Sequence, residues 1–158
     1  MTELTINMWS QEQTNWCWAA VSTSVALYYN EKSHWRQCII VNTQLAQTTC
    51  CVKGDTKACD QPSSLTTALT TTGNLNKMTP SSISLSAVNT EINAKRPIGA
   101  RIDWGDGSAH VMAITGSLVN DIVQIKDPFS GETKMSYTQF RDNYQGSGTW
   151  SHSYTTKA

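Results

Sequence analysis

Cysteine and histidine are the side chains through which this chain of 158 residues could carry out nucleophilic chemistry, and it contains five Cys and three His. Cys17 lies where a helix from about Trp16 to Tyr29 should begin. At such a position the unpaired backbone N–H groups and the helix dipole favour a thiolate over a thiol. A thiolate is among the best nucleophiles at neutral pH. Because most free cysteines are small buried hydrophobes, Cys17 becomes a candidate nucleophile only if a base can reach it.

His110 is the candidate base. It opens an alternating strand, Val111–Ile114, directly after a glycine-rich turn, whereas His34 and His152 lie in polar segments. Asp127 ends the following strand, and if the two strands form a hairpin the two strand-end side chains can lie side by side. A carboxylate there would hold the imidazole in the productive tautomer. The alternatives are a structural histidine at a strand end and an Asp-Pro turn.

The elements that must position these residues change in character near Pro97. Before Pro97 the apolar spacing is helical, and it predicts helices over residues 16–29, 36–47, 62–73 and 84–96. Thr14 or Asn15 is expected to cap the first helix, Ser84 to cap the fourth, and Pro62 to lie in the first turn of the third. After Pro97 the sequence alternates, which predicts strands over residues 98–104, 110–115, 122–127, 133–137 and 149–154.

Helices followed by strands separated by short turns predict an α+β fold with an antiparallel sheet. The length of 158 residues fits one domain over 1–158, with a helical half at about 11–96 and a β half at about 97–158. We expect the active-site cleft to lie between these two halves.

The composition argues against two classes of function. Twelve Lys and Arg balance twelve Asp and Glu, so the chain lacks the basic excess of an electrostatic nucleic-acid binder or a polybasic membrane-surface protein. No stretch approaches the roughly 20 apolar residues of a membrane span. Only 15% of the residues are charged, against about 25% in soluble domains, and Thr, Ser, Asn and Gln fill the difference.

Residues 11–20 read Gln-Glu-Gln-Thr-Asn-Trp-Cys-Trp-Ala-Ala. This segment resembles the active-site segment of papain-like cysteine proteases, with a Gln at the family's spacing before the Cys and an aromatic residue directly after it. The form Asn-Trp-Cys-Trp-Ala-Ala is most similar to the bacterial branch of secreted plant-pathogen effector proteases. Residues 109–111, 126–131 and 137–140, with Trp150, are similar to the same branch, so the resemblance covers nearly the whole chain in order.

The resemblance implies a papain-like fold and a role for each matching residue. Cys17 would be the nucleophile, His110 the base and later the acid, and Asp127 the residue that orients His110, a position that papain fills with Asn. Gln11 would donate to the oxyanion together with the backbone N–H of Cys17, and such a donor is typically worth about 3 kcal/mol. Gln13, only two residues away, is the rival for that role. No cofactor and no metal ion are implied.

The remaining four cysteines, Cys38, Cys50, Cys51 and Cys59, lie close together between the first and third predicted helices. Two disulfides are the favoured interpretation, with three connectivities open, and the charge-poor composition suits an exported protein. A zinc site is the first alternative, although the spacing lacks the paired C-x2-C knuckles of most structural zinc sites. Four reduced thiols are the second alternative.

The leading interpretation is a thiol endopeptidase that cleaves a protein or peptide substrate through an acyl-thioester on Cys17. A deamidase, transglutaminase or amidase is the alternative, because the triad sets acyl transfer and not the acceptor. An inactive binding module would be the non-enzymatic alternative. We expect a monomeric bacterial effector or toxin, secreted or delivered into a target cell, although residues 1–10 contain no visible signal peptide. The sequence leaves open whether an inhibitor or immunity protein binds it.

Overall fold

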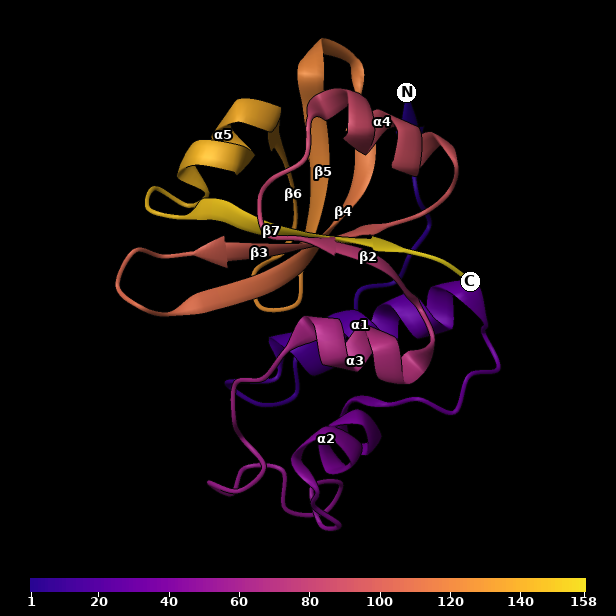
Figure 1. The fold of residues 1–158 in the computed structure, drawn as a ribbon, viewed down its shortest axis with the longest axis vertical. Coiled ribbons are helices and arrows are strands. Elements are labelled where there is room, and N and C mark those ends of the chain that lie inside the picture. Colours follow the sequence, from indigo (N-terminus) through magenta and orange to yellow (C-terminus); the bar gives the residue numbers. More distant parts are fainter.

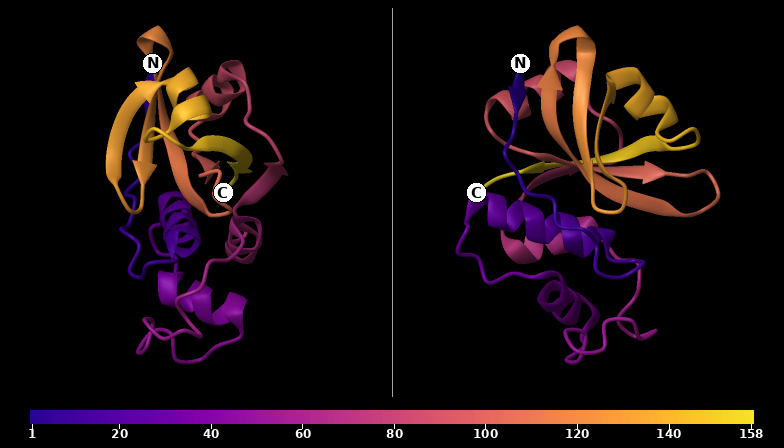
Figure 2. Two further views of the ribbon diagram at one scale, coloured as in Figure 1. Left: turned by 90° about the vertical axis from the view of Figure 1, so that its left-hand side faces the viewer. Right: turned by 180° about the vertical axis from the view of Figure 1, so that it is seen from behind.

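A layer of helices and an antiparallel sheet make up the computed structural model, which describes residues 1–158 (Figure 1). The helical layer contains α1 (Cys17–Tyr29), α2 (Gln37–Leu45) and α3 (Leu65–Thr72). α1 and α3 lie between the sheet and α2, and the views in Figure 2 place the helical layer at one end of the molecule. The predicted α+β class is confirmed.

The sheet has seven strands in the order β2-β7-β3-β4-β5-β6, with β1 paired to β4, and every pairing is antiparallel. The strands are β1 (Thr2–Glu3), β2 (Leu75–Thr79), β3 (Ile98–Asp103), β4 (Ala109–Leu118), β5 (Ile122–Asp127), β6 (Gly131–Ser136) and β7 (Thr149–Thr156). A single 3-10 turn, Val119–Asp121, joins β4 to β5. Two further helices, α4 (Leu85–Asn93) and α5 (Tyr137–Asn143), lie on the side of the sheet away from α1 and α3 (Figure 1).

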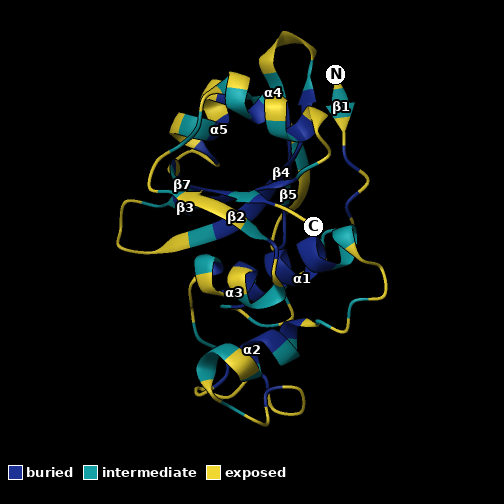
Figure 3. Ribbon diagram, turned by 45° about the vertical axis from the view of Figure 1, so that its right-hand side comes forward, coloured by how far each residue is buried: buried dark blue, intermediate teal, exposed yellow.

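The central helix α1 is buried from Trp18 to Ala26, and Figure 3 shows how little of it reaches the surface. Its small and apolar residues surround the helix axis, which is the pattern of a helix packed on several sides. No side chain caps its N-terminus, so the predicted cap at Thr14 or Asn15 is wrong. Asn15 instead donates its backbone N–H to Asp60 Oδ1 at 2.8 Å. This hydrogen bond anchors the start of the helix to the neighbouring loop.

The other helix ends follow local sequence signals. The Ser84 hydroxyl accepts the backbone N–H of Ala87, as predicted for the cap of α4. Gly73, with φ of 83°, ends α3 in the left-handed conformation that glycine adopts without steric cost. α3 begins at Leu65 after a Ser64 cap, so the prediction that Pro62 lies in its first turn is wrong.

The boundary predicted near Pro97 does not separate the two layers. β2 pairs with β7 at the edge of the sheet, and α4 packs on β4, so the residues from Leu75 to Pro97 already belong to the sheet side of the molecule. The sequence does not predict β2, because three of its five residues are exposed at the edge of the sheet. Apolar and polar residues therefore do not alternate along this strand. Tyr137, predicted to end a strand, begins α5 because the Ser136 hydroxyl caps that helix.

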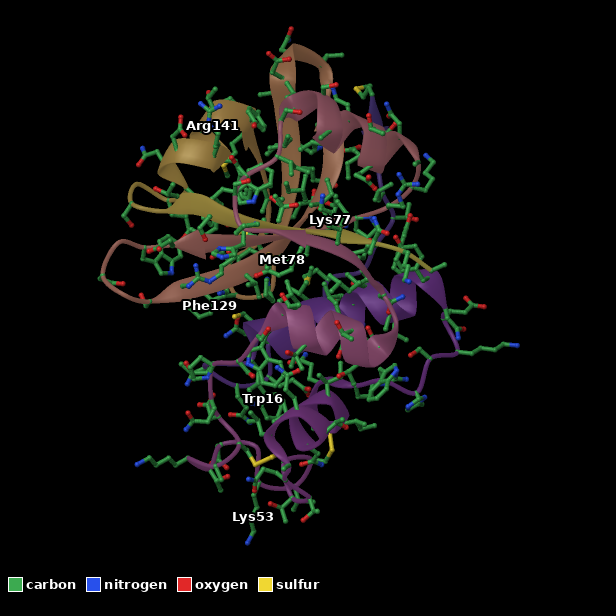
Figure 4. All side chains as sticks on the ribbon, viewed as in Figure 1. Trp16, Lys53, Lys77, Met78, Phe129 and Arg141 are labelled. Carbon is green, nitrogen blue, oxygen red and sulfur yellow. A yellow bond between two sulfur atoms is a disulfide. The ribbon has the colours of Figure 1, made fainter.

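The disulfide Cys38–Cys51 joins α2 to the loop that precedes α3, and Cys50–Cys59 closes a segment within that loop. Cys17 is the free cysteine. The favoured disulfide interpretation is confirmed, with adjacent cysteines bonded to different partners. Figure 4 shows both bonds at the end of the helical layer away from the sheet. None of the helices combines the length and the apolar character that crossing a bilayer requires.

Candidate active site

A cavity of about 690 Å³ lies between the helical layer and the sheet. Its walls come from the first residues of α1 and α3 on one side and from β2, β3, β4 and β7 on the other. Cys17 lines it from the helical wall and His110 from the sheet wall. The cavity has the size of a site for a small ligand or a short stretch of peptide. The helical and sheet layers thus bring the predicted nucleophile and the predicted base to one cleft.

The carboxylate of Asp127 lies behind His110 and is 2% exposed. His110 Nε2 donates to Asp127 Oδ1 at 2.7 Å, and the backbone N–H groups of Phe129 and Ser130 donate to the same oxygen. The Tyr144 hydroxyl donates to Oδ2 at 2.8 Å. Burial alone would raise the pKa of Asp127, but these hydrogen bonds and the neighbouring imidazole bring it below the usual value. The carboxylate therefore stays ionised and fixes the imidazole ring.

The charge of His110 follows from its two partners. Burial alone would lower the pKa of His110, but the hydrogen bond to Asp127 and the neighbouring Cys17 outweigh burial and raise it to about 9. Because Nε2 is bonded to Asp127, Nδ1 is the nitrogen left for Cys17. At neutral pH the ring is an imidazolium that can stabilise a thiolate on Cys17 and later release a proton.

The start of α1 is held in place by the disulfide-bonded loop. The indole N–H of Trp16 donates to the carbonyl of Cys59 at 2.8 Å, and that of Trp18 donates to the carbonyl of Gln61 at 2.9 Å. Both indoles are buried. These contacts place half-buried Cys17 as the first residue of α1, where the backbone N–H groups of the first turn have no partner within the helix.

The structure does not bring Gln11 to the cavity wall. Its amide nitrogen donates to the carbonyls of Gln13 and Thr14 at 3.1 and 2.7 Å, and its Oε1 is buried without a partner. Its backbone N–H donates to the carbonyl of Pro128, which ties the segment before Cys17 to the loop after β5. The side chain of Gln13 packs beside Gly54 and does not line the cavity either.

Residues 1–145 match the family model described as the papain-like cysteine protease AvrRpt2. The chain belongs to this family. It is a papain-like cysteine protease, a hydrolase of peptide bonds. Among solved structures this protease is similar to Pseudomonas avirulence protein AvrPphB, with 12% identity, a TM-score of 0.45 and coverage of 97% of this chain and 98% of that chain. No curated protein matches its sequence significantly.

Two aromatic residues of the protease complete the surroundings of His110. The sequence suggests a cleft wall or the core for Trp104 and gives Tyr144 no role. Trp104 stacks on the His110 ring, with centroids 6.5 Å apart and planes at 18°, and on the ring of Tyr144 at 6.2 Å. Tyr144 is fully buried and anchors Asp127 through its hydroxyl. Trp104 ends a predicted strand directly before the glycine-rich turn, which is a weak signal. Nothing in the local sequence marks Tyr144, because it follows α5 and its partner Asp127 lies on β5.

Proposed function

We propose that this papain-like cysteine protease is an endopeptidase that cleaves protein substrates through Cys17, His110 and Asp127. The observation that carries the proposal is the 2.7 Å hydrogen bond from His110 to Asp127, beside a cleft that Cys17 and His110 line from opposite walls. A buried carboxylate, an imidazolium and a thiol at a helix N-terminus are what thiol acyl transfer requires.

In the proposed reaction the thiolate of Cys17 attacks the carbonyl carbon of the scissile peptide and forms a C–S bond. His110 then donates its proton to the departing amine as the C–N bond breaks. In the second half, His110 accepts a proton from water while the water oxygen attacks the thioester. The C–S bond breaks, and the peptide leaves as a carboxylic acid that gives its proton to solvent. The Cys17 thiolate and the His110 imidazolium are regenerated. Asp127 keeps the ring oriented throughout and stabilises its positive charge.

We further propose that the oxyanion is stabilised by the backbone N–H of Cys17 and by the amide of Gln11. Because that amide donates to Gln13 and Thr14 carbonyls, it would have to rotate when substrate binds. Gln11→Ala should then lower kcat by about 100-fold, whereas Gln13→Ala should change it little. The reverse pattern would assign the donor role to Gln13.

The site of action is part of the same proposal. We propose that the enzyme is exported by a bacterium as an effector or toxin, either secreted or delivered into a target cell, and acts as a monomer. The two disulfides and the charge-poor composition support an oxidising location at some stage of its life.

Labelling with a Cys-directed epoxide and profiling of new N-termini in a protein mixture test the proposal together. Wild type should label at Cys17 and create new N-termini, and Cys17→Ala should do neither while keeping its fold. His110→Ala should lose activity, whereas His34→Ala, outside the cleft, should retain it. Deamidated or cross-linked products without new N-termini would contradict the endopeptidase and favour a deamidase or a transglutaminase.

A further inference from the structure

An arginine lies in the cleft without an acidic partner. Half-buried Arg101, on β3, lines the same cavity as Cys17 and His110. None of the side chains that line this cavity is an Asp or a Glu. The cavity therefore carries a local positive charge, although the chain as a whole has no net charge.

The guanidinium of Arg101 uses little of its bonding capacity within the protein. It makes one hydrogen bond, from Nη1 to Ser151 Oγ at 3.0 Å, out of the five N–H donors that the group carries. It takes part in none of the five ion pairs of the structure. Asp103, two residues along the same face of β3, accepts the backbone N–H of Gly105 instead. A half-buried guanidinium with free N–H donors can bind the carboxylate of a ligand.

The neighbours of Arg101 on β7 are uncharged side chains that line the same cavity as Cys17. His152, its register partner on β7, has a pKa lowered by burial and by Arg101, with the charge of Asp103 acting in the opposite direction, so its ring is neutral at neutral pH. Tyr154, also on β7, is buried and lines the cavity. Burial raises the pKa of Tyr154, so its phenol is also uncharged at neutral pH.

We propose that Arg101 binds a carboxylate of the substrate, so that the enzyme prefers an Asp or Glu side chain at one fixed position near the scissile bond. The inference rests on the proposed endopeptidase. The guanidinium would pair with the carboxylate through two parallel N–H···O bonds, and exposed Met78 on β2 gives the same wall an apolar edge (Figure 4). A free C-terminal carboxylate has the same chemistry, so the test separates it from a side chain.

The test begins with cleavage sites mapped in peptides from a digested proteome. Matched peptides of the preferred sequence then carry Asp or Asn, or Glu or Gln, at the enriched position. They are acetylated and amidated, so that a side chain supplies the only carboxylate. Wild type should cleave the acidic member about 10- to 100-fold faster in kcat/KM. Faster cleavage only of peptides with a free C-terminus would overturn the side-chain assignment.

Variants locate the preference at Arg101. Arg101→Gln should remove the preference by lowering kcat/KM for the acidic peptide only, and Arg101→Glu should favour Lys at the same position. Arg141→Gln is the matched control, because Arg141 lies on α5 away from the cleft and pairs with Asp142 (Figure 4). It should keep the wild-type preference.

The outcomes separate this inference from the function on which it rests. Cys17-dependent cleavage with equal rates for the acidic and amide peptides would overturn the role of Arg101 and leave the endopeptidase intact. An absence of any Cys17-dependent cleavage would overturn both. If Arg101→Gln does not fold, the wild-type comparison stands without it. Binding of the same peptide pair to Cys17→Ala then supplies a second measurement, in which the acidic peptide should bind about 10-fold tighter or more.

Discussion

Replacing Asp127 with Asn tests how a buried carboxylate sets the charge of His110. Asn keeps the shape and the Oδ1 acceptor, which receives His110 Nε2 and the backbone N–H groups of Phe129 and Ser130. The new amide nitrogen would face Tyr144, whose hydroxyl can turn from donor to acceptor. The substitution therefore removes one negative charge and changes the packing little.

The magnitude follows from the pKa of His110, which is about 9 in place of the ordinary 6.5. Each pKa unit corresponds to about 1.4 kcal/mol, so protonation of His110 stabilises the folded protein by about 3 kcal/mol. Its side chain is only 14% exposed, so solvent screens the pair weakly. Asp127 is the largest of the influences that raise the pKa, ahead of Cys17. Asp127→Asn should therefore remove most of this stabilisation.

The raised pKa of His110 also sets the direction in which stability changes with pH. Because the pKa of His110 is higher in the folded state than in the unfolded state, the stabilisation is complete below pH 6.5 and is lost as pH rises through about 9. Urea unfolding should show Asp127→Asn less stable than wild type by up to about 3 kcal/mol at pH 6 and by much less at pH 10. The basic limb of kcat/KM, near pH 9 in wild type, should move toward lower pH in the variant.

Asp142→Asn is the control for this experiment, because it also removes an ion-paired carboxylate but lies exposed on α5. It should shift neither the basic limb nor the pH dependence of unfolding between pH 6 and 10. If Asp127→Asn costs the same free energy of unfolding at pH 6 and pH 10, and its basic limb does not move, the carboxylate does not control the charge of His110.

Three further variants test the supports of the site. Cys50→Ala with Cys59→Ala should lower the free energy of unfolding by roughly 3 kcal/mol, because the unfolded chain loses a cross-link; an unchanged urea midpoint under oxidising conditions would contradict this. Tyr144→Phe should cost about 1.5–3 kcal/mol of stability by removing a donor to a buried carboxylate, as read from urea unfolding at pH 7. Gly54→Ala would place a Cβ 2.8 Å from Trp16 Cη2. It should destabilise by about 1–3 kcal/mol, and a thermal midpoint equal to wild type would show that the loop adjusts freely.

Local sequence patterns predicted most of the regular structure. The helix that begins at Cys17 and the strand that carries His110 both appear at the predicted places, because apolar periodicity and turn residues act over a few neighbouring positions. The missed elements are those without such a pattern. β2 is an exposed edge strand, and α5 has seven residues, only two of them buried.

The candidate site was predicted in part for the same reason. The residue types and order of Cys17, His110 and Asp127 suggested a thiol triad, and a hairpin between their strands suggested that the last two could meet. The hydrogen bond between those two side chains, at 2.7 Å, depends on how β4 and β5 pair and twist. The position of Gln11 differs from expectation because its amide binds carbonyls of its own loop.

The sequence by itself determined the available chemistry: one cysteine at a helix start, a histidine and an aspartate at strand ends, and four further cysteines clustered in one segment. The tertiary structure alone decided which groups meet. The Tyr144 hydroxyl donates to Asp127 from a different element of the fold. The guanidinium of Arg101 reaches the cleft that α1 and β4 also line. Such contacts depend on the packing of one layer against another, which no short window of sequence records.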